Sequence, residues 1–177
     1  DSTVYKDENA FRLTNNYSAG FLYTAEELRK RGDTQKAIDM VNLAIKTVPG
    51  EWRSQAYLMQ LYADMDSLDR VAELLKTAPP ELDPKTMWQT LASDLYRRGL
   101  RDKAIDMLND RLTEDPHFDG AYKQLLSIYF KESMTDSMEK LLDRWIANNP
   151  SDTEAISAMK DVQELKQAES GVKLRQL

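Results

Sequence analysis

The sequence predicts an all-α fold in which helical hairpins repeat along the chain and a last helix caps the final hairpin. Three observations lead to this prediction: a segment that recurs, prolines that recur at the same spacing, and a composition with only 6 Gly and 6 Pro in 177 residues. Glycine and proline disfavour helix interiors, whereas Ala, Leu, Glu and Lys favour them. The predicted fold class is therefore an α-solenoid of about four hairpins.

The clearest repeat is a nine-residue segment. Residues 32–40 (GDTQKAIDM) and 99–107 (GLRDKAIDM) are identical at six of nine positions. A weaker copy places Val71 midway between Ala37 and Ala104, and a fourth copy places Met138 one such interval after Ala104. This interval, about 34 residues, is the period of a helix–turn–helix unit.

The prolines follow the same period. Pro49, Pro116 and Pro150 each end a helical pattern, and Pro84 lies one residue out of step. A proline cannot continue a helix, and it disfavours helical dihedral angles in the residue before it. Each of these prolines therefore marks a junction between hairpins.

The order of large, small and turn residues within each copy resembles that of the tetratricopeptide repeat family, and the resemblance covers about residues 18–169. The third copy supplies the large, small and turn residues of the family's first helix, namely Trp88, Leu91, Ala92, Leu95 and Gly99. The first copy supplies those of the second helix, namely Ala37, Val41, Ala44 and Pro49. The second copy fits through Leu58, Tyr62, Val71, Leu75 and Ala78, with Asp66 where the family has a turn glycine. In the fourth copy Met138 and Trp145 replace small residues, so we expect wider packing there. The resemblance implies a right-handed superhelix.

The repeat positions divide the chain into three parts. Residues 1–17 are a predicted lead-in or cap, with Phe11 and Leu13 lying on the first hairpin. Residues 18–150 are four repeats, at about 18–51, 52–84, 85–118 and 119–150. Residues 151–177 are the C-terminal capping helix and tail.

Local signals predict where helices begin. Asp33 and Ser67 are expected to cap the second helices of their hairpins, and Asp83 precedes a proline in a first turn. The segment 151–154 (SDTE) resembles a capping box that opens a helix running to about Glu169. The apolar face of that helix is expected to cover the end of the stack, through Ile156, Met159 and Val162.

The lead-in carries a second resemblance. Its motifs VY (4–5), DEN (7–9), RL (12–13) and NY (16–17) run directly into Phe21 and the first repeat. This junction resembles the one in large bacterial membrane proteins related to protein O-mannosyltransferases. Those proteins carry a glycosyltransferase-like domain of unknown function among many transmembrane helices, followed by a tetratricopeptide tail. The resemblance implies that this chain, which begins with Asp and not Met, is the extracytoplasmic, periplasmic tail of such a protein.

Composition excludes several classes of function. With no Cys, the chain lacks the residues for disulfides and thiol catalysis, and its single His, His117, leaves almost no room for a histidine metal site or a catalytic triad. The net charge of −6 argues against nucleic acid and anionic membranes as partners. No apolar run approaches the length of a transmembrane helix, so no direct membrane insertion by this chain is expected. The acidic segment 64–69 lacks the glycine of a calcium loop. We therefore expect no catalytic residue, no cofactor and no metal, hence no enzyme in this chain.

By repeat position, the first-helix side chains that do not pack line the concave inner surface, which we call the predicted wall. Its members are Leu22, Glu26, Arg29, Arg53, Gln60, Ala63, Gln89, Ser93, Tyr96, Arg97, Lys123, Ser127, Phe130 and Lys131. Partner contacts are predicted for Arg29, Arg53, Gln60, Gln89, Tyr96, Arg97, Lys123 and Phe130.

The chemistry of the predicted wall suggests ligands. Its basic groups favour an acidic or carboxylate-bearing segment, unless they are ordinary solvated side chains. Tyr96 and Phe130 form a predicted aromatic cluster for an apolar side chain or a sugar ring. Family members that bind chaperone C-termini have a Lys and an Asn where this chain has Leu22 and Glu26, so that ligand is excluded.

These observations predict a non-catalytic protein–protein interaction module. In the first hypothesis it is the soluble extracytoplasmic repeat tail of a glycosyltransferase-like membrane protein, and it presents its concave surface to a partner or acceptor protein. The alternative is a free-standing soluble adaptor of the same fold, located in the cytoplasm and without a link to glycosylation. The two hypotheses differ in what precedes Asp1, and both leave the partner and the oligomeric state open.

Overall fold

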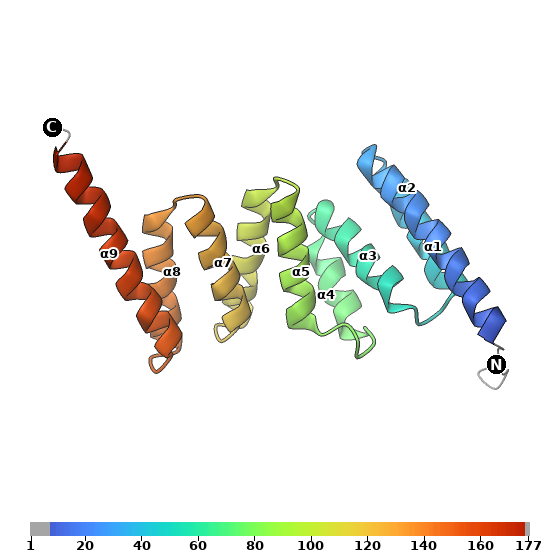
Figure 1. The fold of residues 1–177 in the computed structure, drawn as a ribbon. Helices are drawn as coiled ribbons and strands as arrows, with labels where there is room; N and C mark the ends of the chain where they lie inside the picture. The colour runs from blue at the N-terminus through green and yellow to red at the C-terminus, as the bar shows by residue number, and fades with distance from the viewer. Residues whose placement is uncertain (1–7, 176–177) are drawn as a thin grey trace. The chain divides into compact units, whose positions relative to one another are not determined.

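The computed structural model describes the backbone of residues 8–175 and the side chains of residues 16–168. Over this range the chain is all-α, which confirms the predicted fold class (Figure 1). The helices are α1 (Glu8–Lys30), α2 (Thr34–Thr47), α3 (Trp52–Asp64), α4 (Leu68–Lys76), α5 (Pro84–Arg97), α6 (Arg101–Glu114), α7 (Asp119–Lys131), α8 (Thr135–Asn148) and α9 (Thr153–Arg175).

The chain divides into two compact units, residues 1–87 and 88–177, with the boundary inside α5. In the first unit α1 packs on α2 and α3 on α4; in the second α7 packs on α8, and α9 lies against α8. Helices α5 and α6 are joined in the second unit by the Arg111 guanidinium, which lies 4.5 Å from the centre of the Trp88 ring. Each described pair is thus a hairpin, and α9 is the single helix after the last hairpin.

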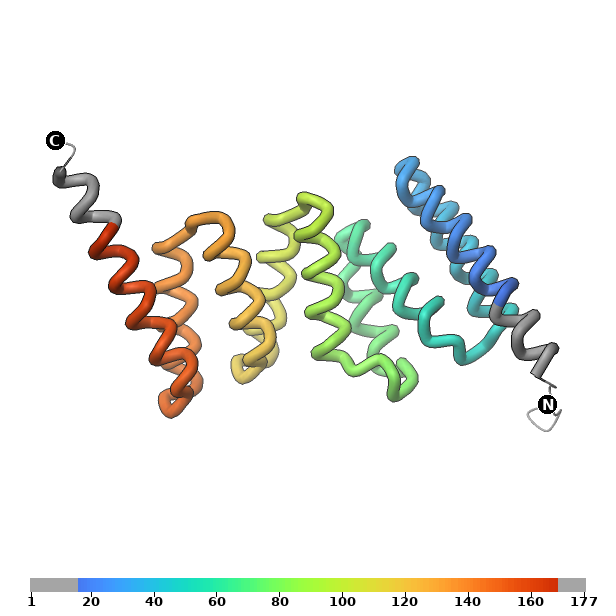
Figure 2. The backbone as a smooth tube through the Cα atoms, in the orientation of Figure 1, coloured from blue at the N-terminus to red at the C-terminus, as the bar shows by residue number. Residues whose placement is uncertain are grey.

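The same left-handed turn closes every hairpin. The residues with positive φ in these turns are Gly32 (83°), Asp66 (56°), Gly99 (80°) and Ser133 (56°), and they recur with the period of the sequence repeat. The residue after each donates its backbone N–H to a carbonyl five positions back, at 2.8–2.9 Å, which is the helix-ending motif that a left-handed residue permits. Figure 2 shows these tight reversals, for example between α7 and α8. The turn therefore keeps its place in the repeat even where glycine is replaced.

Small residues lie at the centre of the hairpins. In the first unit the side chains of Ala25 and Ala37 are fully buried in one apolar cluster with Val41 and Leu61. In the second unit Ala92 and Ala104 are also fully buried. A methyl side chain at the crossing point lets two helix axes approach closely, and larger neighbours fill the remaining space.

The fourth hairpin is built differently. Its buried Trp145 stacks on Tyr122 with ring centres 5.1 Å apart and an interplanar angle of 6°. Met138, the other large residue at a usually small position, is also buried. The aromatic pair therefore packs α7 against α8, as the Trp88–Arg111 contact does for α5 and α6.

Helix capping differs from the prediction in three places. Asp33 and Ser67 are the N-cap residues of α2 and α4, but neither side chain bonds to a backbone N–H of its helix. Asp83 caps α5 as predicted, by accepting from the Thr86 N–H at 2.8 Å. At α9 the cap is Asp152 and not Ser151, because Asp152 accepts from the N–H groups of Glu154 and Ala155, at 2.9 and 3.1 Å.

Some helix bounds also differ. Helix α1 begins at Glu8, inside the predicted lead-in, and α9 extends to Arg175, beyond the expected end at Glu169. Helix α4 ends at Lys76, so Ala78 lies outside it, before Pro79 and Pro80. The side chains of Phe11 and Leu13 are outside the described residues. The repeat boundaries at 18–51, 52–84, 85–118 and 119–150, and the superhelical sense, stay predictions.

Replacing Ser133 by glycine is expected to raise the free energy of unfolding by about 0.5–1 kcal/mol. The left-handed conformation costs an L-residue other than glycine about 1–2 kcal/mol. Replacement by glycine removes this cost, but glycine loses more conformational entropy on folding, so the net gain is smaller. Gly99→Ser is expected to lower the free energy by a similar amount, since it places a side chain on the equivalent residue. Urea unfolding followed by circular dichroism measures both, with Ser157→Gly in the interior of α9 as a control that destabilises. A loss of stability in Ser133→Gly would contradict the role of the turn.

Candidate functional site

A groove opens in the second unit between α7 and α9, with α8 as its floor. Its volume is about 470 Å³. We call it the α7–α9 groove, and its lining residues are Lys123, Leu126, Ser127 and Phe130 of α7, Met138 and Trp145 of α8, and Glu154, Ala158, Asp161, Val162 and Leu165 of α9. Figure 1 shows these three helices side by side.

Helical periodicity places these residues on facing surfaces. In α7, residues 123, 126, 127 and 130 recur at three- and four-residue spacing, which is one face of a helix. Residues on the opposite side, including Leu125, Ile128 and Tyr129, are buried in the hairpin. In α9, residues 154, 158, 161, 162 and 165 form a similar stripe. The groove therefore lies between a first helix and the capping helix, beside the two large residues of α8.

The groove is apolar and its edges are accessible. The side chain of Phe130 is 64% exposed and that of Leu165 is 38% exposed, although both are large and apolar. The floor is formed by Trp145, which is 1% exposed and held in place by its stack on Tyr122. A concave apolar surface with a fixed floor is the usual form of a binding site, because occupying it removes apolar surface from water.

Charges are sparse along the groove and they do not balance. The Lys123 ammonium lies 2.6 Å from a Glu154 carboxylate oxygen, so these two charges compensate each other across the groove. Asp161 is exposed, and its carboxylate forms no ion pair with any residue that the structure describes. The lining thus carries one uncompensated negative charge.

Of the residues predicted from the sequence, the structure brings Lys123, Ser127 and Phe130 together in this groove. Tyr96, predicted to form one aromatic cluster with Phe130, lines a different cavity of about 640 Å³ at the α5–α6 turn. Charged residues line that cavity as well, Arg97 and Glu132 among them. The two aromatic residues thus line different cavities, and the shared aromatic cluster stays a prediction.

The Tyr96 side chain is part of a polar cluster. Its hydroxyl donates to Glu132 at 2.8 Å, and Arg101 donates to the other oxygen of Glu132 at 3.2 Å. These two donors hold the pKa of the Glu132 carboxyl below its usual value. The Lys131 ammonium lies 5.6 Å from the centre of the Tyr96 ring. Ring and hydroxyl are thus both engaged within the unit.

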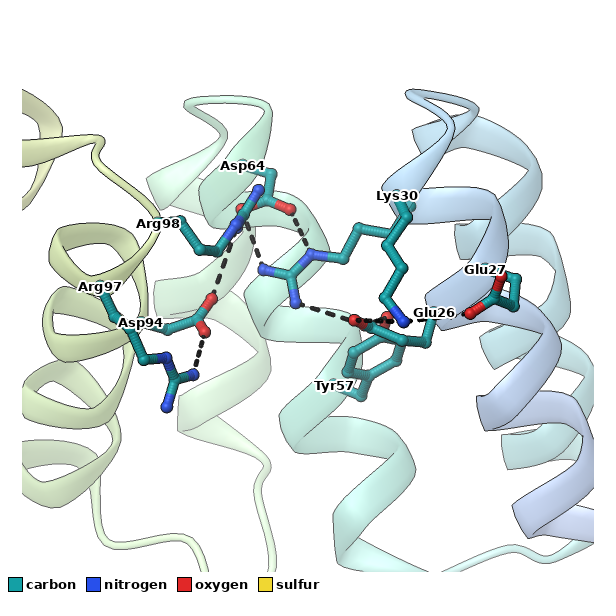
Figure 3. Close-up of polar contacts among 9 residues, drawn as sticks. Glu26, Glu27, Lys30, Tyr57, Asp64, Asp94, Arg97 and Arg98 are labelled. Carbon is teal, nitrogen blue, oxygen red and sulfur yellow. Dashed lines mark hydrogen bonds and ion pairs between the residues drawn. The ribbon is translucent and has the colours of Figure 1, made fainter.

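In the first unit a polar network joins α1 to α3 on the same helices as the predicted wall. The Arg29 guanidinium donates to both carboxylate oxygens of Asp64, at 2.7 and 3.2 Å. Both side chains are buried, at 8% and 9% exposure. Tyr57 donates to Glu26, and Figure 3 shows Tyr57 beside Glu26, with Asp64 further along α3. Burial, with this hydrogen bond, raises the pKa of Tyr57. Arg29 therefore ties two helices together.

The remaining predicted contacts are distributed over both units. Arg53 is exposed and lies 5.0 Å from the centre of the Trp52 ring. Arg97 is paired with Asp94 at 2.6 Å. Gln60 and Gln89 are half-buried, and the Gln89 amide lies so close to Gly120 that a Cβ there would be 2.4 Å from its nitrogen.

One predicted wall position is wrong, and one part of the groove was missed. Ala63 is 2% exposed and belongs to the core, because α3 turns it away from the surface. The α9 side of the groove, with Ala158, Asp161 and Leu165, was not predicted. The three- and four-residue spacing of that stripe in α9 was the available signal.

Two further findings concern the described residues alone. None of their helices has both the length and the apolar character needed to cross a membrane. No group of three His, Cys, Asp or Glu side chains among them lies close enough to hold a metal ion.

Comparisons with known proteins give similarities only among solved structures. Neither protein-family models nor curated proteins match the chain. The MamA protein is 20% identical, over 90% of this chain and 88% of its own, with a TM-score of 0.45. PilF of Pseudomonas aeruginosa is 14% identical over 92% of this chain and 74% of its own, with a TM-score of 0.46. A tetratricopeptide repeat protein of Parabacteroides merdae is 15% identical over 86% and 61%, with a TM-score of 0.45.

Arg29→Ala is expected to lower the free energy of unfolding by about 2–4 kcal/mol, because it leaves the buried Asp64 carboxylate without its arginine. Arg53→Ala removes the same side chain from an exposed position of the same predicted wall, and is expected to change stability by less than about 0.5 kcal/mol. Chemical denaturation of both variants measures the difference. Equal effects would show that Arg29 is not a structural residue.

Proposed function

We propose that this chain is a non-catalytic protein-interaction module whose binding surface is the α7–α9 groove. One observation carries the proposal: an apolar groove of about 470 Å³ with the Phe130 side chain 64% exposed at its edge. Exposed apolar side chains that gather around a concavity are favourable only when something covers them. A protein segment bound in the groove would remove the apolar surface of Phe130 and Leu165 from water, and this burial would favour binding.

The other surfaces of the predicted wall support this choice by contrast. Arg29 is held by Asp64, Arg97 by Asp94, and Tyr96 by Glu132. A ligand at those positions competes with contacts that already exist within the unit. At the groove edge, Phe130 and Leu165 present apolar surface to solvent without such competition.

We further propose that the module is the extracytoplasmic tail of a membrane protein with a glycosyltransferase-like domain. What supports this is the resemblance of residues 4–17 to the junction in such proteins, although residues 4–7 of that segment lie outside the described residues. In that setting the groove holds an acceptor protein, or a partner subunit, near the membrane domain. A cytoplasmic adaptor of the same fold is the competing proposal.

A photo-reactive phenylalanine analogue at position 130 of the native protein tests the binding surface. We expect ultraviolet light to join it to a second protein in living cells, because the partner covers this side chain. The control is the same analogue at Tyr17 on α1, which is 65% exposed and thus equally accessible. Absence of an adduct at 130, or equal adducts at both positions, would overturn the α7–α9 groove as the binding surface.

Protease added to intact spheroplasts tests the location. If the chain is an extracytoplasmic tail, an antibody to it loses its signal from the membrane fraction before lysis, while a cytoplasmic marker stays intact. Protection of the chain until lysis, in the soluble fraction, would favour the cytoplasmic adaptor and remove the link to glycosylation. This result is independent of which surface binds the partner.

A further inference from the structure

We infer that the α7–α9 groove selects a protein segment that combines large apolar side chains with a lysine or arginine. The inference rests on the proposed function, and it concerns the chemistry of the ligand. It differs from the acidic ligand that the basic residues of the predicted wall suggest.

The apolar requirement follows from the lining. Leu126 and Phe130 of α7 face Ala158, Val162 and Leu165 of α9 over the Trp145 floor. The stripe on α9 runs from residue 154 to residue 165, which is about 16 Å of helix at a rise of 1.5 Å per residue. A segment that fills such a groove must present two or more large apolar side chains, since a polar one would lose its hydration without gaining a partner.

The basic requirement follows from the charge balance. Lys123 is the cation that the lining contributes, and Glu154 compensates it at 2.6 Å. An acidic ligand would have to displace Glu154 from Lys123, and it would approach Asp161 as well. A lysine or arginine of the ligand instead meets the Asp161 carboxylate, which has no ion pair among the described residues. Asp161 lies one turn from both Ala158 and Leu165, so this charge borders the apolar surface.

The rest of the chain does not reverse this preference. Two basic residues of the predicted wall are already paired within the chain. Arg29 is buried against Asp64, and Arg97 lies 2.6 Å from Asp94. The chain as a whole carries a net charge of −6, which also favours the approach of a basic segment. Charge and apolar surface thus select the same kind of ligand.

Selection of a random peptide display library on the whole 177-residue chain tests the inference. We expect enriched peptides to carry two or more large apolar residues and at least one Lys or Arg. Phe130→Ala is expected to weaken their binding about tenfold, as truncation of a central interface aromatic does, and Tyr17→Ala to leave it unchanged.

The charge is tested by reversal. Asp161→Lys is expected to weaken the binding of the basic peptides about three- to tenfold, because it replaces an attraction between charges by a repulsion. The loss is expected to be larger at low salt than at high salt, since salt screens charges that are exposed to solvent. Asp110→Lys is the matched control: it makes the same charge change at an exposed residue of α6, outside the groove lining, and we expect no effect. A selection repeated on the Asp161→Lys variant is expected to enrich acidic residues in place of basic ones.

The outcomes separate the two proposals. Peptides that depend on Phe130 but are acidic, or are insensitive to Asp161→Lys, would overturn the inference and leave the groove as a binding site. Two other outcomes would overturn both the inference and the proposed function. In one, no peptide is enriched over the bare support; in the other, the enriched peptides bind equally well to the Phe130→Ala variant.

Discussion

The close approach of two helices in each hairpin is the constraint on which the rest of this structure depends. Fully buried alanines, such as Ala37 and Ala104, allow that approach, and a left-handed residue in the turn sets it. In each hairpin the residue after that turn donates its N–H to a carbonyl five positions back, which fixes the path of the chain out of the first helix. Because the turn recurs with the sequence period, the hairpins among the described residues are closed in the same way.

The groove exists because the fourth hairpin departs from this rule. Met138 lies one repeat interval after Ala104, and the buried Trp145 is held by its stack on Tyr122. The capping helix α9 then lies against α8 through Ala155 and Val162, which are buried. Large side chains on α8 form a floor, and the edges belong to Phe130 on one side and Leu165 on the other. These two large side chains thus provide the part of the groove that α8 contributes.

Much of the fold could be predicted from the sequence, because the residues that determine the helices and turns recur at a regular spacing. The repeat located the hairpins, the turn at Gly99 and the apolar face of α9 around Val162. It did not find Ser133, because serine carries no turn signal of its own; only its spacing of 34 residues from Gly99 marks the position. Nor did it find the cap at Asp152, because neighbouring Ser151 has an equally suitable side chain.

The site was predicted only in part, for a physical reason. Repeat position tells which side of a helix a residue occupies, and on that basis Lys123 and Phe130 were predicted on one open face of α7, the face that lines the groove. It does not tell whether a charge is compensated by a residue on another helix, as Arg29 is by Asp64, 35 positions away. That depends on the distance between helices and on side-chain rotamers. Among the basic residues of the predicted wall, Arg29, Arg97 and Lys123 thus form ion pairs within the chain, whereas Arg53 is exposed.

The most direct measurement of the central claim is a fluorine NMR titration of the chain carrying 5-fluorotryptophan with a peptide selected on it. The three tryptophans report on three places: Trp145 on the groove floor, Trp88 under Arg111, and Trp52 beside Arg53. The account predicts that the Trp145 resonance shifts with peptide concentration while those of Trp52 and Trp88 stay in place. A shift of Trp52 or Trp88 with an unchanged Trp145 would contradict it, because the ligand would then lie outside the α7–α9 groove.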